Sequence, residues 1–311
     1  MSRYILGRLV QLVPVLVMMS LIVFAVMHLL PGDPAQLMLA GAEGGAISPE
    51  RLGELREQMG LNEPLYVQYL SFVWNAVQGD LGNSIRFQVP VTSLIADRFP
   101  STIALAASGL VVAIAIGLPL GMIAAARKGG WTDTICMSLS YIGSSMPVYW
   151  LGLLLILVFS FNLRWFPSAG GEGLRALVLP AVTLGILSAG ILARLIRSSM
   201  LEVGVEDYML VARAKGLPGR LILWRHGLKN AMIPVVTMMG LQFGALLAGT
   251  VVTETVFSRP GLGRLIVSAI VNKDYPLVQG TILFLAVVYL SVNLLVDIAY
   301  AWLDPRIRYE T

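Results

Sequence analysis

The stretch FPSTIALAASGLVVAIAIGLPLGMIAAA, residues Phe99–Ala126, decides the fold class, because its 28 residues contain no charged side chain. Five further stretches share this property: Leu9–Gly32, Thr134–Leu163, Ala176–Ala193, Asn230–Thr253 and Tyr275–Val296. The shortest has 18 residues. At a helical rise of about 1.5 Å per residue it spans about 27 Å, close to a hydrocarbon core of about 30 Å. The sequence therefore predicts an all-α polytopic membrane protein with six transmembrane helices.

The composition agrees with a bilayer environment. Hydrophobic residues make up 57% and charged residues 13% of the 311 positions, and the mean hydropathy is +0.78. This leaves too few polar side chains to cover a soluble globule of this size. The net charge of +4 and the pI near 9.3 do not indicate nucleic-acid binding, because the basic residues sit between the hydrophobic runs instead of forming one stripe.

Cysteine and histidine usage excludes two further classes. Cys136 is the single cysteine, so the chain has no internal disulfide framework. The two histidines, His28 and His226, lie too far apart for a local metal-ligand pair. An intramembrane enzyme is disfavoured, because these residues form no nucleophile, base or metal set by spacing.

The lysines and arginines predict the orientation of the spans. One arrangement puts thirteen of the 22 basic residues on the side of both termini, and four of the other nine lie in the long segment after the first span. Basic residues in long segments contribute little to orientation. Both termini are therefore expected in the cytoplasm. The apolar run after Arg3 and Arg8 is too long for a cleaved signal peptide, so we expect a retained first helix.

The segment between the first two spans, about 33–98, is predicted to form two amphipathic helices outside the cell membrane. Ser48 is a candidate N-cap before Pro49, and Gly60 is placed to end this helix. A second helical pattern follows Pro64 and ends at Gly79. Two interpretations stay open: a lid that packs on the bundle, and a docking surface for a substrate-delivering partner.

The segment between the fourth and fifth spans, about 198–230, is predicted to hold a two-turn helix with clear stops. Asp207 caps a helix over Tyr208–Lys215, Gly216 supplies the positive φ of a helix end, and Pro218 blocks continuation. A basic helix over Arg220–Lys229 then runs into the fifth span. Small side chains at Ala212 and Ala214 would let another protein approach the backbone. The alternative is a connecting loop whose basic residues hold lipid phosphates.

Within the bilayer the sequence offers packing sites and one more polar helix. The glycine pairs at 117 and 121 and at 240 and 244 permit close helix approach. Ser138, Tyr141 and Ser145 share one face of the third helix and are candidate pathway residues, although such serines also bond their own backbone. No acid or base lies in the middle of a span, which argues against a proton-coupled secondary carrier.

Several ordered motifs carry a resemblance that covers nearly the whole chain. The two longest are EDYMLVARAKGL at 206–217 and HGLKNAMIP at 226–234. The others are LPGDP at 30–34, GDLGNS at 79–84, ETVF at 254–257, PGLGR at 260–264, DYP at 274–276 and LDPRIR at 303–308. Together they resemble permeases of ATP-binding-cassette importers, in the dipeptide and oligopeptide branch, and within it the first permease subunit. The general signature has Glu and Ala where this chain has Leu210 and Val211, and Arg259 stands where an aromatic residue is usual.

The resemblance implies a type I importer permease fold, as a single domain over 1–311 in the bacterial inner membrane. It implies a second homologous permease, two ATPase subunits that bind ATP and Mg, and an extracytoplasmic solute-binding protein. The chain itself holds no cofactor and is not an enzyme, consistent with the lack of a Gly-x-x-x-x-Gly-Lys-Ser/Thr loop. The implied cargo is a dipeptide, oligopeptide or glutathione-like peptide; nickel complexes and other small solutes remain alternatives. The implied ATPase-coupling helix comprises Asp207, Tyr208, Ala212, Arg213, Ala214, Lys215, Gly216 and Leu217.

Overall fold

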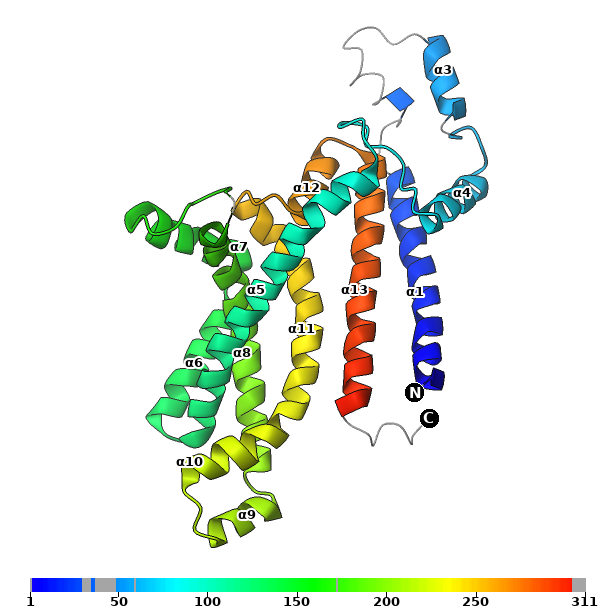
Figure 1. Cartoon of the computed structure of the whole chain (residues 1–311). Coiled ribbons are helices and arrows are strands. Elements are labelled where there is room, and N and C mark those ends of the chain that lie inside the picture. The colour runs from blue at the N-terminus through cyan, green and yellow to red at the C-terminus, as the bar shows by residue number, and fades with distance from the viewer. Residues whose placement is uncertain (1, 30–34, 37–48, 59, 172, 304–311) are drawn as a thin grey trace. The chain divides into compact units, whose positions relative to one another are not determined.

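The computed structural model describes residues 2–29, 35–36, 49–58, 60–171 and 173–303 (Figure 1). Helices make up the described part, apart from turns and one isolated backbone bridge between Asn83 and Pro90. The chain forms two compact units, Met1–Pro100 with Gly261–Leu294 and Ser101–Pro260 with Leu295–Thr311. The predicted Ser48 cap and the motifs at 30–34 and 304–308 lie outside the described residues.

Five helices are long and apolar enough to cross a membrane, as the charge-free stretches predict. They are α1 (Ser2–Leu29), α5 (Val91–Ala126), α8 (Leu174–Val203), α11 (Leu228–Val256) and α13 (Tyr275–Leu303). Each contains one of the predicted stretches, or all of it except the last few residues. The prediction of a multi-pass helical membrane protein is confirmed.

The third stretch, Thr134–Leu163, is not the straight span that its length predicts. It is divided into α6 (Trp131–Ser145) and α7 (Val148–Leu155), the latter continuing as the π-helical η1 (Ile156–Asn162), with a bend of 104° at the break. The proline ring of Pro147 disfavours helical backbone at the residue before it, and Met146 is extended (φ −74°, ψ 134°). The number of spans is therefore six only if this broken pair is one span.

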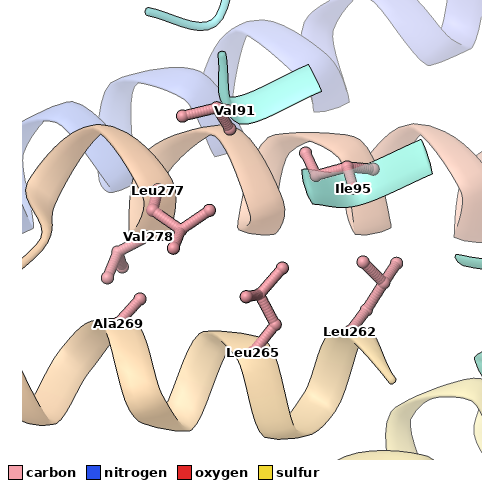
Figure 2. Close-up of a cluster of buried hydrophobic side chains, with 7 residues drawn as sticks. All are labelled: Val91, Ile95, Leu262, Leu265, Ala269, Leu277 and Val278. Atoms are coloured by element: carbon pink, nitrogen blue, oxygen red, sulfur yellow. The ribbon is translucent and has the colours of Figure 1, made fainter. Parts of the chain in front are cut away.

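The first unit is held by a core between the start of α5, α13 and the short α12 (Leu262–Val271). Figure 2 shows its seven buried side chains, which are Val91, Ile95, Leu262, Leu265, Ala269, Leu277 and Val278. The spacing of Leu262, Leu265 and Ala269 puts all three on one face of α12. This apolar face fixes the corner where α12 meets α13.

The two helices predicted between the first spans are present in the first unit. The helix α3 (Pro49–Gln58) begins at the expected proline, and Gly60 has the positive φ (66°) of a chain leaving a helix. The helix α4 (Leu65–Val77) packs against α1, because the Tyr69 hydroxyl lies 2.9 Å from Ser20 Oγ and its ring meets Phe24 edge-on at 5.5 Å. This packing agrees with the lid interpretation and leaves the docking interpretation untested.

Within the second unit, α5 and α8 lie in close contact. A Cβ added at Gly117 would lie 2.8 Å from the Ala189 carbonyl oxygen, and one at Gly121 only 2.6 Å from that of Ala193. Neither position has room for a side chain, so the predicted packing role of this glycine pair is confirmed. In the same unit a Cβ at Gly240 would clash with the Val296 side chain.

Candidate functional site

The short helix α9 (Asp207–Ala214) lies between the two long helices α8 and α11 along the chain. Glu206 is extended (φ −65°, ψ 147°), and its carbonyl accepts hydrogen bonds from the backbone N–H groups of Met209 and Leu210. Glu206 therefore occupies the cap position that the sequence assigned to Asp207, and the predicted helix is displaced by one residue. Asp207 instead lies in the first turn, where a negative charge meets the positive end of the helix dipole.

The end of α9 follows the predicted stop. Gly216 has a φ of 72°, its N–H donates to the Arg213 carbonyl at 2.9 Å, and the Leu217 N–H donates to the Ala212 carbonyl at 3.4 Å. These two bonds form a Schellman motif, which needs a left-handed residue after the cap. Lys215 is this cap rather than a helical residue. Pro218 then precedes α10 (Gly219–Leu221).

The next segment differs from the basic helix predicted over Arg220–Lys229. It consists of α10, the π-helical η2 (Ile222–Gly227) and the start of α11 at Leu228. A π turn leaves a local irregularity where one residue is added to the helical repeat. The helical segment that leads into the fifth span is thus present, but part of it has π-helical instead of α-helical hydrogen bonds.

Buried side chains anchor α9 to its neighbours. Met209 and Ala212 pack with Ile222 in one apolar cluster, flanked by Val203 and Leu217. Of the two alanines proposed as a small contact surface, Ala212 is 6% exposed and belongs to this cluster, whereas Ala214 is exposed. The small side chain of Ala212 therefore fits a space between residues of its own chain and is not a contact surface for another protein.

Polar contacts tie α9 to the ends of both long helices. The Arg213 Nη2 donates to the carbonyl of Gly204, directly after α8, at 3.2 Å. The Asn230 Nδ2, in the first turn of α11, donates to the Tyr208 hydroxyl at 2.7 Å. A displacement of α9 would therefore pull on α8 and α11 together.

The outer surface of α9 carries apolar side chains. Leu210 and Val211, the residues that depart from the general signature, are 51% and 52% exposed. Tyr208, Ala214 and Lys215 are exposed beside them. An apolar patch on a short helix is typical of a surface that another protein covers.

The candidate pathway residues lie on the exposed side of α6. Ser138, Tyr141 and Ser145 are all exposed, while the face with Asp133, Cys136, Ser140 and Gly143 is buried. The face of α6 with the three candidate residues is therefore not covered by other parts of the second unit. Ser145 is the last residue of α6, before the bend to α7. The role of these three residues in a pathway stays a prediction.

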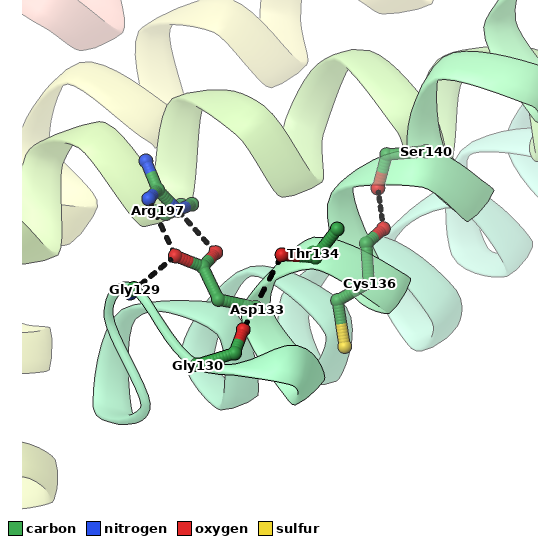
Figure 3. Close-up of polar contacts among 7 residues, drawn as sticks. All are labelled: Gly129, Gly130, Asp133, Thr134, Cys136, Ser140 and Arg197. Carbon is green, nitrogen blue, oxygen red and sulfur yellow. Dashed lines mark hydrogen bonds and ion pairs between the residues drawn. The ribbon is translucent and has the colours of Figure 1, made fainter.

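An ion pair between α6 and α8 was missed by sequence reasoning. The Arg197 Nε and Nη2 donate to the two Asp133 carboxylate oxygens at 2.6 and 2.7 Å, and the Gly129 N–H donates to Asp133 Oδ2 at 2.9 Å (Figure 3). This bidentate geometry is the strong form of the arginine–carboxylate pair. Asp133 directly precedes a charge-free stretch, but no local pattern connects it with a residue 64 positions later.

A second buried carboxylate holds the first unit together. Asp274 is 1% exposed, and its oxygens accept from Ser84 Oγ at 2.5 Å and from the N–H groups of Ile85 (3.1 Å), Arg86 (3.2 Å) and Leu277 (3.4 Å). We call these five residues the Asp274 clasp. It joins the GDLGNS and DYP motifs, which are far apart in the sequence, so these motifs meet at one structural joint.

The ETVF motif contributes a further buried acid, Glu254, which lies in the second unit. Glu254 is fully buried and accepts a hydrogen bond from Thr102 Oγ1 at 2.7 Å. The nearby Arg259 has a buried Nε atom without a hydrogen-bond acceptor. Burial lowers the pKa of Arg259, while the charge of Glu254 acts in the opposite direction. Among the described residues no group of three His, Cys, Asp or Glu side chains could hold a metal ion.

Comparisons with known proteins agree on the family. "Binding-protein-dependent transport system inner membrane component" matches residues 117–309, and the corresponding N-terminal family matches residues 1–106. The glutathione transport system permease protein GsiC of Escherichia coli K12 is 45% identical over 310 residues, covering all of both chains. That of Salmonella choleraesuis is 43% identical over the same length.

Solved structures support the same fold. A chain of the MetNI methionine ABC transporter in an inward-facing conformation aligns with a TM-score of 0.60 at 17% identity, covering 68% of this chain and 96% of that one. A chain of an amino acid ABC transporter crystallised with histidines aligns with a TM-score of 0.51 at 17% identity, covering 69% and 94%. At this identity the similarity concerns the fold alone.

Proposed function

The chain belongs to the family of inner membrane components of binding-protein-dependent transport systems, and on that premise we propose that it imports glutathione or similar short peptides. It is a multi-pass permease subunit of an ATP-binding-cassette importer and not itself an enzyme. The proposed cargo rests on the relatives that carry glutathione in their names over the full length of this chain.

The observation that carries the coupling part of the proposal is the attachment of α9. This helix has buried anchors at Met209 and Ala212, hydrogen bonds toward both α8 and α11, and an exposed apolar patch at Leu210 and Val211. A rigid helix fixed to two spans transmits a displacement that a flexible loop would absorb. We assign the exposed face of α9, with Asp207, Tyr208, Ala214 and Lys215, to contact with an ATPase subunit.

The proposed assembly contains a second homologous permease, two ATPases that bind ATP and Mg, and a solute-binding protein. In this assembly both termini and α9 lie in the cytoplasm, and the segment 33–98 lies on the opposite side, as the basic residues predict. We treat the two compact units as parts of one permease domain. Closure of the ATPase pair would move α9 and switch the bundle between inward-facing and outward-facing states.

Reconstitution tests this proposal. Proteoliposomes with the two permeases, two ATPases, enclosed ATP and external binding protein should accumulate radiolabelled glutathione, and the chain purified alone should hydrolyse no ATP. Omission of the ATPases should abolish uptake. Uptake that persists without ATPases would contradict the proposed function and favour a self-contained carrier.

A further inference from the structure

A pocket of about 390 Å³ opens between α6 and α8 and is lined by Asp133, Thr134, Met137, Tyr141, Arg194 and Arg197. Two of its charges neutralise each other, because Asp133 is engaged by both nitrogens of the Arg197 fork (Figure 3). The pocket is not enclosed, since Tyr141 on its wall is 58% exposed. A small molecule can therefore enter it without any rearrangement of the second unit.

The other guanidinium in this pocket, that of Arg194, has neutral partners. Its Nη1 donates to Ser144 Oγ at 2.9 Å and to the Ser140 carbonyl at 3.4 Å, and its central carbon lies 4.9 Å from the Tyr141 ring centroid. The structure pairs Arg194 with no carboxylate of the described residues. The lining side chains therefore carry one positive charge that no acid in the pocket compensates.

The position of Arg194 along the helices is unusual for a residue that holds lipid headgroups. Trp131 begins α6 next to Arg127 and Lys128 and is 86% exposed, as expected at a membrane surface. The serines that Arg194 contacts lie 9 and 13 residues further along α6, which is about 14–20 Å along the helix axis. The guanidinium thus lies far from the end of α6 that carries Trp131.

The direction of the Arg194 side chain leads to the same conclusion. The α8 residues 190 and 197 lie beside the α6 residues 140 and 133, respectively, so the two helices run antiparallel. Arg194 extends from α8 toward Ser144, away from the end of α6 that carries Trp131. An arginine that reaches for headgroup phosphate from this position would extend the opposite way, toward the surface.

The exposed surface of α6 separates into two stripes beside the pocket. Ile135, Leu139 and Ile142 are 53–56% exposed and apolar, as lipid contact requires. About 100° around the helix, Thr134, Ser138, Tyr141 and Ser145 form an exposed polar stripe. Hydroxyls can bond their own helix, as Thr134 does with the Gly130 carbonyl, but a guanidinium in a span faces water or protein rather than lipid tails. Arg194, beside this stripe, is therefore expected to open onto a polar space.

We propose that Arg194, oriented by Tyr141 and Ser144, binds a carboxylate of the transported solute within the bundle. This site rests on the proposed function, because it needs a solute that passes this surface of the permease. A planar guanidinium binds a carboxylate through two parallel hydrogen bonds. The site therefore favours peptides with free carboxyl groups over neutral solutes, and it adds Arg194 to the pathway residues.

The first test compares solute uptake by variant complexes. Arg194→Gln keeps hydrogen-bonding capacity and removes the charge, so ATP-driven uptake of glutathione should fall at least about tenfold. Arg175→Gln, the same change at an exposed position on α8, is the matched control and should transport like the parent. Delivery by the binding protein is identical in all three complexes. Equal uptake by the Arg194→Gln complex and its parent would overturn the proposal.

The second test measures binding to the assembled complex without the binding protein. Millimolar glutathione should raise the thermal unfolding midpoint of the parent complex, while glutathione diethyl ester, whose carboxyls are blocked, should not. The rise should vanish in Arg194→Gln and persist in Arg175→Gln. No rise in the parent, or the same rise in Arg194→Gln, would contradict a carboxylate site.

Two further outcomes would assign the charge elsewhere and also overturn the proposal. If the Arg194→Gln defect follows the anionic lipid content of the vesicles and not the carboxyls of the probe, the pocket holds lipid phosphate. If Arg194→Gln prevents assembly, Arg194 holds the complex together and does not bind the solute. A parent complex that imports no glutathione contradicts the proposed cargo. The binding measurement then still shows whether the pocket binds a carboxylate.

Discussion

The Asp274 clasp and the α9 segment (residues 204–217) both connect long helices, yet different forces hold them. The clasp has one buried carboxylate that four donors satisfy within a single unit. In α9 only two side chains are buried, and most of its surface, including Leu210 and Val211, is exposed. A satisfied buried polar network fixes one geometry, whereas a small apolar anchor leaves a surface for a partner. The clasp is thus a joint within the chain, and α9 presents the surface that we propose for contact with an ATPase subunit.

The largest expected difference between the clasp and the α9 segment is that they lie on opposite sides of the membrane. Asn83, beside the clasp, and Lys215, after α9, are both exposed, while the single cysteine is buried. In a Cys136→Ser background, Asn83→Cys should react with an impermeant maleimide in intact cells, and Lys215→Cys only after lysis. The parent without cysteine controls for background, and labelling of position 215 in intact cells would reverse the orientation.

Loss of the clasp should cost the most stability. Asp274→Ala leaves buried donors at Ser84, Ile85 and Leu277 without their acceptor, at a cost of about 3–5 kcal/mol in the free energy of unfolding. The thermal unfolding midpoint of the complex should fall accordingly.

The matched control is Asp80→Ala in the same loop. Asp80 accepts one exposed hydrogen bond, from the Gly82 N–H, so its loss should cost less than about 1 kcal/mol. If the two alanine variants unfold at the same temperature, the clasp is not the joint that holds this unit.

A change on the outer face of α9 should spare stability and affect transport. Ala214→Asp places a charge where we propose an ATPase contact, and an unpaired charge in such an interface costs several kcal/mol. Glutathione uptake and ATP hydrolysis by the complex should therefore fall together at least about tenfold, with normal amounts of the chain in the membrane.

The corresponding change at an exposed alanine of the first unit is the control. Ala96 lies exposed on the first turns of α5, so Ala96→Asp should alter transport little. Parent-like transport by Ala214→Asp would mean that α9 is not the coupling element.

The smallest expected effect concerns the stop after α9. Gly216→Val forces a β-branched residue into a φ of 72°, and nothing lies within 4 Å of the added Cβ, so the cost is backbone strain of about 1–3 kcal/mol. Uptake should decline partially, with the midpoint of global unfolding nearly unchanged because α9 has few buried contacts. Gly219→Val, at an open position without a positive φ, should behave like the parent; equal uptake by both valine variants would show that the left-handed turn is not required.

Local patterns predicted the features that depend on neighbouring residues. The charge-free runs predicted six spans, of which five are long apolar helices. The residues around Pro49 and Gly60 predicted α3, and Gly216 predicted the stop of α9, because hydropathy and backbone strain act within a few positions. Both ends of α9 lie one residue earlier than predicted. A helix end depends on which backbone carbonyl accepts the first or last hydrogen bond, and the sequence pattern does not determine this to the residue. The break within the third stretch was not predicted, because the length argument did not consider Pro147.

The sequence alone therefore determined that this chain crosses a membrane several times, where its helices run and to which family its motifs point. Only the tertiary structure decided which distant groups meet: Asp133 with Arg197, 64 residues apart, and Asp274 with Ser84, 190 residues apart. It also placed Ala212 inside and Ala214 outside, and put Arg194 among neutral partners. Such pairings follow from how helices pack against each other, because burial and charge pairing depend on distances that no local period of the chain encodes.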